Sequence, residues 1–370
     1  MITQGSARFS LAAAGVAEAA SMDQKHLSLV EVPHRLPGRV TLADVARLCD
    51  VTPATVSRVL NRQKTFSTSD AVRERIHATA EKLGYVPDLA ARNFRRRETH
   101  IVGVFANPLA HVTEGINESL LEGVAVVLHT AGYDVFFELR SSPKAAFPNW
   151  RFDAAILLQQ PRPETVAELD RRHVPYACVN ERSGGAFANV LADDAMGMER
   201  ALQHLSQLRH KQIAYANARL AHVHHYSVNE RYDALLSGAA ARGMAVSPGH
   251  HLPMTSPTEF LRAAVVDDGA TAVVTYDHQL AVMLVGAAHE LSLRIPHDFS
   301  LICFNDVFPV ALLPPPLTAV AVSGREMGRR GAELLLNRLI SPARANATTR
   351  EVRVPEDLVV RASTAPPPLG

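Results

Sequence analysis

Residues 40–61 place one arginine among small side chains on the outer face of a predicted helix. Val56, Val59 and Leu60 recur at helical spacing and would be buried, so Arg58 lies on the opposite face. Small side chains allow close approach to a DNA major groove, where an arginine can donate two hydrogen bonds to a guanine edge. The residues that we expect to contact DNA here are Thr41, Thr52, Pro53, Ala54, Thr55, Ser57, Arg58 and Asn61.

Two short helices joined by a tight turn would present this face. Thr41 and Asp44 have the spacing of a capping box. The apolar residues expected to point inward from the first helix are Leu42, Val45, Ala46 and Leu48. The pattern predicts a helix-turn-helix, and an ordinary helical hairpin with no DNA partner is the alternative.

The turn and the second helix have their own signals. Asp50 tolerates the left-handed backbone that a sharp turn can demand, and Val51 would plug the angle between the helices. Thr52 is a good N-cap, and Pro53 suits the first helical position. Ser69 would cap a third helix, which ends at Gly84. Its apolar residues are Val72, Ile76, Ala80 and Leu83.

This segment resembles the headpiece of the lactose/galactose repressor (LacI/GalR) family, whose motif has the form VT-x-x-DVA-x-x-x-GVS-x-x-TVSRVLN. The resemblance continues through SDAVRERIHATAEKLGYVPDLAAR at residues 69–92 and covers nearly all of the chain after residue 39. Asp50 replaces the family's turn glycine, and residues 62–68 are about two residues longer than usual. The resemblance implies a transcription regulator, most often a repressor.

Residues 88–97, DLAARNFRRR, match the family's hinge helix, which binds the DNA minor groove paired with its dimer mate. Phe94 occupies the position of the wedging leucine, and the arginines beside it can neutralise phosphates. We therefore add Ala91, Phe94 and Arg95 to the expected DNA contacts. A helix this short needs support to persist in water. A solvated basic linker is the alternative.

The distribution of charge along the sequence agrees with a DNA-binding segment near the N-terminus. The whole chain has a formal charge of +1, whereas residues 39–100 hold twelve Lys/Arg against seven Asp/Glu, a local +5. Three widely spaced cysteines indicate neither a disulfide framework nor a Cys-type zinc site, so we expect a reducing compartment, the cytoplasm. Residues 1–38 read as a disordered extension, because Glu18 and modest hydropathy argue against a signal peptide. No stretch is apolar enough to span a membrane.

After residue 100, apolar strands alternate with helices, which predicts parallel sheets with ligands at the carboxyl ends of the strands. The expected strands are 101–105, 134–138, 154–158, 176–180, 212–216, 272–276 and 301–304. The resemblance implies a periplasmic-binding-protein-like core of two lobes crossed three times by the chain. We expect lobe one at 101–191 plus 321–350 and lobe two at 192–320 plus 351–363. The crossover at 141–150 is too short for the usual helix.

The domains expected from these patterns follow the order of the chain. They are a disordered extension at 1–38, a helix-turn-helix headpiece at 39–86, a hinge at 87–98, a two-lobed effector-binding and dimerisation core at 99–363, and a flexible tail at 364–370.

Five polar residues match the family's effector pocket. Asn180, Asp277 and Asn305 each follow an apolar strand, and Ser227 and Arg231 match the pocket arginine and the residue four before it. Amides and a carboxylate can read hydroxyl groups, and an arginine can hold a carboxylate, a phosphate or a sugar oxygen. The expected effector is a sugar, a sugar acid or a related polar metabolite. Arg231 could instead form an ion pair with Asp277 or Glu230.

Metal binding and catalysis are less favoured than effector binding. His222, His224 and His225 could bind a metal, but no acid or cysteine accompanies them, and we expect no metal and no cofactor. Asp193 and Asp194 could form a catalytic pair, although helix capping is the simpler role, and we expect no enzyme.

We therefore expect a homodimer that binds double-stranded operator DNA and a small effector. The alternative is a solute-binding or enzymatic protein whose N-terminal helices only mediate association. The sequence STAPPPLG at the end has no leucine heptad, so we expect dimers rather than tail-linked tetramers.

Overall fold

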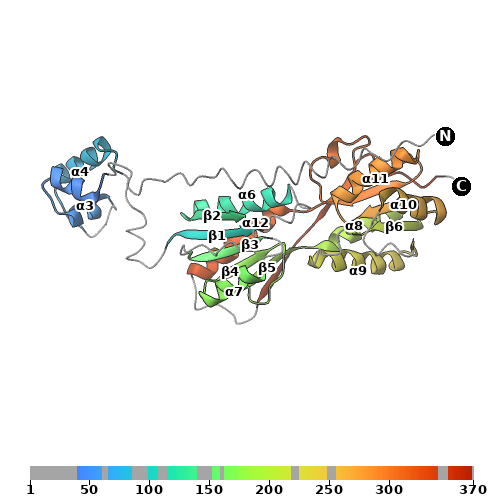
Figure 1. Ribbon diagram of the computed structural model, residues 1–370, viewed down its shortest axis with the longest axis horizontal. Helices are drawn as coiled ribbons and strands as arrows, with labels where there is room; N and C mark the ends of the chain where they lie inside the picture. The colour runs from blue at the N-terminus through green and yellow to red at the C-terminus, as the bar shows by residue number, and fades with distance from the viewer. Residues whose placement is uncertain are drawn as a thin grey trace, which may run out of the picture. The chain divides into compact units, whose positions relative to one another are not determined.

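We describe a computed structural model over residues 40–60, 66–85, 99–106, 115–139, 152–158, 162–217, 225–247, 256–340 and 349–368 (Figure 1). The chain divides into two compact units, Met1–Arg92 and Asn93–Gly370, which we call the headpiece unit and the core unit. No helix in the described ranges combines the length and the apolar character that crossing a membrane requires.

The headpiece unit contains three described helices, α2 (Leu42–Leu48), α3 (Pro53–Leu60) and α4 (Asp70–Lys82). The predicted capping box is present, because Thr41 accepts a hydrogen bond from the amide of Asp44 and Asp44 accepts one from the amide of Thr41. Ser69 caps α4, as expected. The three helices enclose a small core of Val45, Ala46, Cys49, Val56, Val59, Ile76 and Ala80.

The prediction that Leu48 points inward is wrong. Its side chain is 60% exposed, whereas Val45, Ala46 and Cys49 are buried. The inner face of this short helix therefore continues into the turn at Cys49. Asp50 has a φ of 47°, the left-handed backbone expected at the turn, and Val51 packs against the headpiece core.

The core unit contains two six-stranded sheets, one in each lobe. Lobe one has the order β11-β5-β4-β3-β1-β2, and lobe two has the order β12-β10-β9-β8-β6-β7. All pairings are parallel except β10 with β12. The strands are β1 (Ile101–Ala106), β2 (Asp134–Leu139), β3 (Ala154–Leu158), β4 (Tyr176–Val179), β5 (Ala188–Ala192), β6 (Gln212–Ala216), β7 (Ala245–Val246), β8 (Ala272–Thr275), β9 (Ser300–Phe304), β10 (Thr318–Ala321), β11 (Arg350–Val354) and β12 (Asp357–Val359).

Helices cover both sheets (Figure 1). Lobe one carries α6 (Ile116–Thr130) and α12 (Gly324–Ile340) on one face and α7 (Pro163–Arg171) on the other, as its two separate apolar clusters show. Lobe two carries α8 (Asp194–Gln207), α9 (Tyr226–Ala241), α10 (Pro257–Leu261) and α11 (His278–Glu290), with the π-helical turn Arg262–Asp267 after α10 and the 3-10 turn Val310–Leu312 after β9.

All seven expected strands are present, with ends shifted by at most one residue. Continuous apolar runs mark these strands because helices bury both faces of each parallel sheet. Strands β5, β7, β10, β11 and β12 were not predicted. The expected short crossover at 141–150 lies outside the described residues.

The chain passes between the lobes three times within its described part, after β5, after β10 and after β11. The last passage is at residues 355–356 rather than near residue 350, because β11 pairs with β5 of lobe one. The connecting segments, which we call the crossovers, bond to one another. The amide of Asp193 donates to the carbonyl of Val354 at 2.8 Å, and the hydroxyl of Ser323 donates to the carbonyl of Pro355 at 3.3 Å.

Residues near the C-terminus are held by lobe two. Thr364 lies in the segment expected to form a flexible tail, yet its hydroxyl is 2.9 Å from Nε2 of His204. The amide of Ala365 donates to the hydroxyl of Ser300 at 3.0 Å. These bonds fix the chain at least as far as Ala365 on the β9 end of the sheet.

Candidate DNA-binding face and effector cleft

The outer face of α3 carries the expected base-reading residue. Arg58 is exposed, and Thr52, Pro53 and Ala54 are exposed beside it. Thr52 caps the helix, because its Oγ1 accepts a hydrogen bond from the amide of Thr55 at 3.2 Å. The expected DNA contacts Asn61, Ala91, Phe94 and Arg95 lie outside the described residues, as does the expected hinge at 87–98.

In the core unit, Asn180 and Asn305 follow β4 of lobe one and β9 of lobe two. Both have left-handed backbones, with φ of 58° and 71°, a conformation that asparagine adopts more readily than most residues. Both are buried. Oδ1 of Asn305 has no hydrogen-bond partner among the described residues. A buried acceptor without a partner is costly, so a donor supplied by a ligand would stabilise this position.

A chain of hydrogen bonds links Asn180 to lobe two. Nε2 of His225 donates to the carbonyl of Asn180 at 2.7 Å, so Nδ1 of the neutral ring accepts from the hydroxyl of Ser227 at 2.6 Å. The hydroxyl of Tyr276 is then the donor to Ser227 at 2.9 Å. Loss of hydration lowers the pKa of His225 and favours this neutral form. Ser227 therefore belongs to a polar chain between the lobes.

Arg231 is almost fully buried beneath this chain. Its Nε donates to Oδ1 of Asp194 at 2.5 Å, and its Nη1 donates to the carbonyl of Tyr276 at 2.5 Å. Its guanidinium also lies 4.1 Å from the ring centroid of Phe304. The partner of Arg231 is thus Asp194, and neither Asp277 nor Glu230, the two alternatives expected from the sequence, fills that role.

A second acid lies beneath Arg231. Glu356, in the third crossover, is fully buried, and an oxygen of its carboxyl group is 4.0 Å from Nη2 of Arg231. Neither carboxyl oxygen of Glu356 has a hydrogen-bond partner among the described residues. Burial, together with the nearby charge of Asp194, raises the pKa of Glu356 to about 8. The guanidinium therefore faces two buried acids, and loss of hydration raises the pKa of both Asp194 and Glu356.

Asp277 and Asp193 both cap helices. Oδ1 of Asp277 accepts the amide of Leu280 at the start of α11, at 2.8 Å. Asp193 accepts the amide of Met196 at the start of α8, at 3.1 Å, which confirms the capping role expected for this residue. The structure thus gives a structural role to each acid of the Asp193–Asp194 pair.

Ion pairs add a second link between the lobes. Glu230 of α9 accepts two hydrogen bonds from Arg353 of β11, at 2.6 and 2.9 Å, and lies 2.8 Å from Arg182, which follows β4. The two guanidinium groups lie 5.3 and 6.0 Å from the ring centroid of Tyr226. We call Tyr226, Glu230, Arg182 and Arg353 the lobe clasp.

The structure connects the five expected effector residues in one region. Asn180 and Ser227 share the polar chain, and Arg231 contacts the residues immediately before Asp277 and Asn305. The sequence did not indicate Tyr226, Tyr276, Phe304 and Glu356, and it singled out Asp194 without its pairing with Arg231. One sequence feature could have indicated the buried carboxyl group. It is Pro355-Glu356, an acid that follows a proline near the end of a strand-like pattern.

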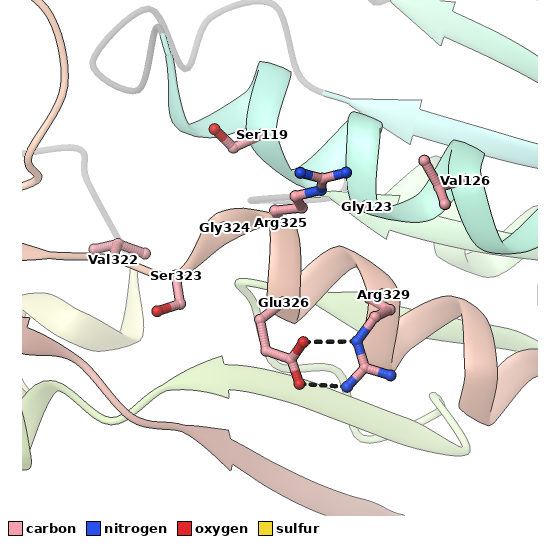
Figure 2. A pocket seen from close by; sticks show the side chains of 9 residues that line it. All are labelled: Ser119, Gly123, Val126, Val322, Ser323, Gly324, Arg325, Glu326 and Arg329. Carbon is pink, nitrogen blue, oxygen red and sulfur yellow. Dashed lines mark hydrogen bonds and ion pairs between the residues drawn. The ribbon is translucent and has the colours of Figure 1, made fainter.

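The described part of lobe one also has an open hollow of about 610 Å³ between α6 and the start of α12, lined by Ser119, Gly123, Val126, Val322, Ser323, Gly324, Arg325, Glu326 and Arg329. Figure 2 shows that Glu326 and Arg329 point toward each other on α12, and their hydrogen bonds are 2.5 and 2.6 Å long. Arg325 pairs with Glu122 of α6 at 3.4 Å. Because these charged groups satisfy one another, we assign no ligand to the hollow.

His225 is the described member of the expected histidine cluster, and it caps α9. His222 and His224 lie outside the described residues. Within those residues, no group of three or more His, Cys, Asp or Glu side chains could hold a metal ion.

A helix-turn-helix headpiece joined to a two-lobed core with buried polar groups where the lobes meet defines a ligand-responsive DNA-binding regulator. Family models agree on both parts. Residues 41–88 match bacterial regulatory proteins of the lacI family, and residues 202–364 match a periplasmic binding protein-like domain. The regulator GalR of Escherichia coli (strain K12) is 30% identical over 312 residues, which cover 80% of this chain and 88% of GalR. The chain belongs to the LacI family of transcription regulators.

Further relatives and solved structures agree with this assignment. The ribose operon repressor of Escherichia coli (strain K12) is 25% identical, with 82% of this chain and 94% of that protein covered. The lac repressor dimer bound to operator and the anti-inducer ONPF has a TM-score of 0.69 at 21% identity, with 88% and 99% covered. The CelR–cellobiose complex has a TM-score of 0.59 at 24% identity, with 88% and 100% covered. At these identities, the two structures establish the fold.

Proposed function

We propose that this protein is a repressor that binds a pseudo-palindromic operator as a homodimer and changes its DNA affinity when a small polar molecule enters the cleft. The observation that carries the proposal is the presence, in one chain, of the exposed Arg58 face and a set of buried polar groups contributed by both lobes. A dimer supplies two headpieces whose two-fold symmetry suits two half-sites. The solved lac repressor dimer on its operator supports this arrangement.

The effector that suits the cleft is an uncharged molecule with several hydroxyl groups. Among the described cleft residues, the positive charge of Arg231 is already compensated by Asp194, so an anionic ligand gains little from it. Asn305 offers a buried acceptor, and the hydroxyl of Tyr276 belongs to the polar chain beside it. Of the classes expected from the sequence, neutral sugars therefore fit better than sugar acids.

Arg231 is the residue that would transmit the state of the cleft to the crossovers. On one side it contacts Tyr276 and Phe304, and on the other it pairs with Asp194 and approaches Glu356. A ligand that displaces the Tyr276 ring therefore disturbs an ion pair beneath the lobe–lobe connection. In lobe one, Asp153 accepts the amide of Thr99 at 2.7 Å, so Thr99, which follows the proposed hinge in the sequence, moves with lobe one.

DNA binding is tested by fluorescence anisotropy on a sequence selected from a random library, at several salt concentrations. We expect the full chain to prefer the selected sequence and Arg58→Ala to lose that preference, because a bidentate arginine–guanine contact contributes about 1–3 kcal/mol of discrimination. Lys82→Ala, which removes one charge at the exposed end of α4, is the control. Absence of any sequence preference in the full chain would refute the proposal.

Effector binding is tested by thermal-shift screening against neutral sugars, polyols and sugar acids. A ligand present at one hundred times its Kd stabilises the protein by about 2.7 kcal/mol. Asn305→Gly keeps the left-handed backbone but removes the amide, so we expect it to reduce the shift. The matched control is Ser292→Gly. It also replaces a residue with a left-handed backbone, with φ of 57°, but this residue lies at the end of α11. Equal shifts in both variants would contradict the assigned cleft.

We place the protein in the cytoplasm with its DNA. Its three cysteines, Cys49, Cys178 and Cys303, are free and buried, and burial raises the pKa of Cys178 to about 12. Buried thiols react slowly, as suits a protein whose signal is a bound ligand.

A further inference from the structure

Phe66, between α3 and α4, lies against the one arginine on the DNA-facing side of α3. The guanidinium carbon of Arg58 is 5.2 Å from the centroid of the Phe66 ring. Phe66 is half-buried and packs on the headpiece core, whereas Arg58 is exposed. Within residues 40–60 and 66–85, Arg58 has no carboxylate partner. The ring is therefore the group that restrains this side chain in the described headpiece.

The contact restrains Arg58 without using the atoms that read DNA. A guanidinium stacks on an aromatic ring through its flat face, while its N–H donors lie in its plane and remain free. Recognition of guanine uses those in-plane donors, which reach O6 and N7 in the major groove. The same arginine can thus be held by Phe66 and bind a base at the same time.

We propose that Phe66 is a specificity-determining positioning residue that orients the guanidinium of Arg58 toward a guanine. The inference rests on the proposed function, since it requires Arg58 to read a base. Phe66 also packs against the headpiece core, so a purely structural role is the competing explanation. The two roles differ in what they require, because packing needs apolar volume at this position and positioning needs an aromatic face.

The test compares full-length variants on DNA selected from a random library by the wild-type protein and on scrambled DNA. Phe66→Leu keeps an apolar side chain without a ring, and Phe66→Tyr keeps the ring. We expect Phe66→Leu to reduce the ratio of specific to non-specific affinity by roughly two- to fivefold, as an exposed cation–π contact of its usual strength would. Phe66→Tyr should retain the wild-type ratio. The salt dependence should not change, because no phosphate contact is lost.

A double-mutant cycle with Arg58→Lys shows whether Phe66 acts through Arg58. We expect Phe66→Leu to have no further effect on selectivity in the Arg58→Lys background. A base-level measurement adds to this cycle. Replacing the guanines of the selected site one at a time by 7-deazaguanine removes the N7 acceptor. At one position, the resulting loss of DNA affinity should be smaller for Phe66→Leu than for the wild type.

Thermal unfolding of each variant separates positioning from packing. If Phe66→Leu unfolds the headpiece, Phe66→Met, which is flexible and fills irregular space, replaces it in the cycle. If the wild type is selective and folded variants without a ring at position 66 are equally selective, the role of Phe66 is overturned but the proposed function is not. The same holds if the effect of Phe66→Leu persists in the Arg58→Lys background. A wild type with no sequence preference overturns the proposed function, and this inference with it.

Discussion

The hydroxyl of Tyr226 in lobe two donates to Oδ1 of Asn180 in lobe one at 3.1 Å, while accepting the amide of Ala192, also in lobe one, at 2.9 Å. One side chain at the first turn of α9 thus bonds to the ends of two strands of the other lobe. The arginines of the lobe clasp lie near its ring. Polar contacts of one side chain therefore link the two lobes in this structure.

Tyr226→Phe should loosen this link. It removes a hydroxyl that makes two hydrogen bonds, each contributing about 0.5–1.5 kcal/mol. We expect faster hydrogen exchange at the amide of Ala192 and a changed affinity for the effector, with the fold of each lobe retained. Tyr232→Phe, on the same helix but packed beside Tyr215 within lobe two, is the control. Unchanged exchange at Ala192 would show that the hydroxyl does not hold the lobes.

Arg231→Ala should destabilise the core strongly. Removing one partner of a buried ion pair leaves Asp194 without compensation and costs about 3–5 kcal/mol. Arg171→Ala removes an exposed ion pair with Glu168 and should change the stability little, because solvent screens this pair. Urea denaturation of both variants measures the difference. Comparable losses would mean that Arg231 is more hydrated than its burial indicates.

Glu356→Gln should remove a pH dependence of stability. The folded protein holds the proton of Glu356 up to a pKa of about 8, whereas the unfolded chain releases it near the ordinary value of 4.5. Between these values the folded state binds more protons, so stability falls as the pH rises, by at most about 1.4 kcal/mol per pH unit from this group. Above pH 8 the contribution is constant.

The measurement for Glu356 is the free energy of unfolding of the wild type and of Glu356→Gln from pH 5 to 9. The stability of the variant relative to the wild type should increase with pH across this window. A difference that does not change with pH would show that Glu356 is ionised in the folded protein.

Gly328→Ala should weaken lobe one. A methyl group at this position in α12 would overlap the carbonyl group of Leu120 in α6, and backbone cannot yield as a side chain can. We expect a loss of about 1–3 kcal/mol, typical of overpacking. Gly286→Ala in α11 has open space around it and should stabilise the protein by about 0.5–1 kcal/mol. Thermal unfolding tests both variants, and their melting temperatures should shift in opposite directions from that of the wild type.

Local patterns predicted the parts of the structure that depend on neighbours in sequence. The capping box of Thr41 and Asp44, the left-handed Asp50 and the cap at Ser69 each involve a few residues, and each is present. Buried parallel strands were recognisable because both of their faces are apolar. Strand β11 was missed because its sequence, REVRV, is largely polar at the edge of the sheet.

The site was harder to predict because its key partners are distant in sequence. Arg231 is paired with Asp194 and approaches Glu356, contacts that arise only once the crossovers meet. Its position was recognisable through family resemblance, but its partner was not, since many acids in the chain could have served. Likewise, the contact of Phe66 with Arg58 depends on the path of the chain after α3, which no periodicity encodes.

The third crossover has a consequence for synthesis on the ribosome. Lobe one obtains its edge strand from residues 350–354 and one of the two helices that cover one face of its sheet from Gly324–Ile340. Until nearly all of this sequence has emerged, the sheet formed by β1 to β5 has an apolar face that only α6 covers and an unpaired edge. Such surfaces invite aggregation, so we expect nascent chains to depend on chaperones more than the size of each lobe alone would indicate.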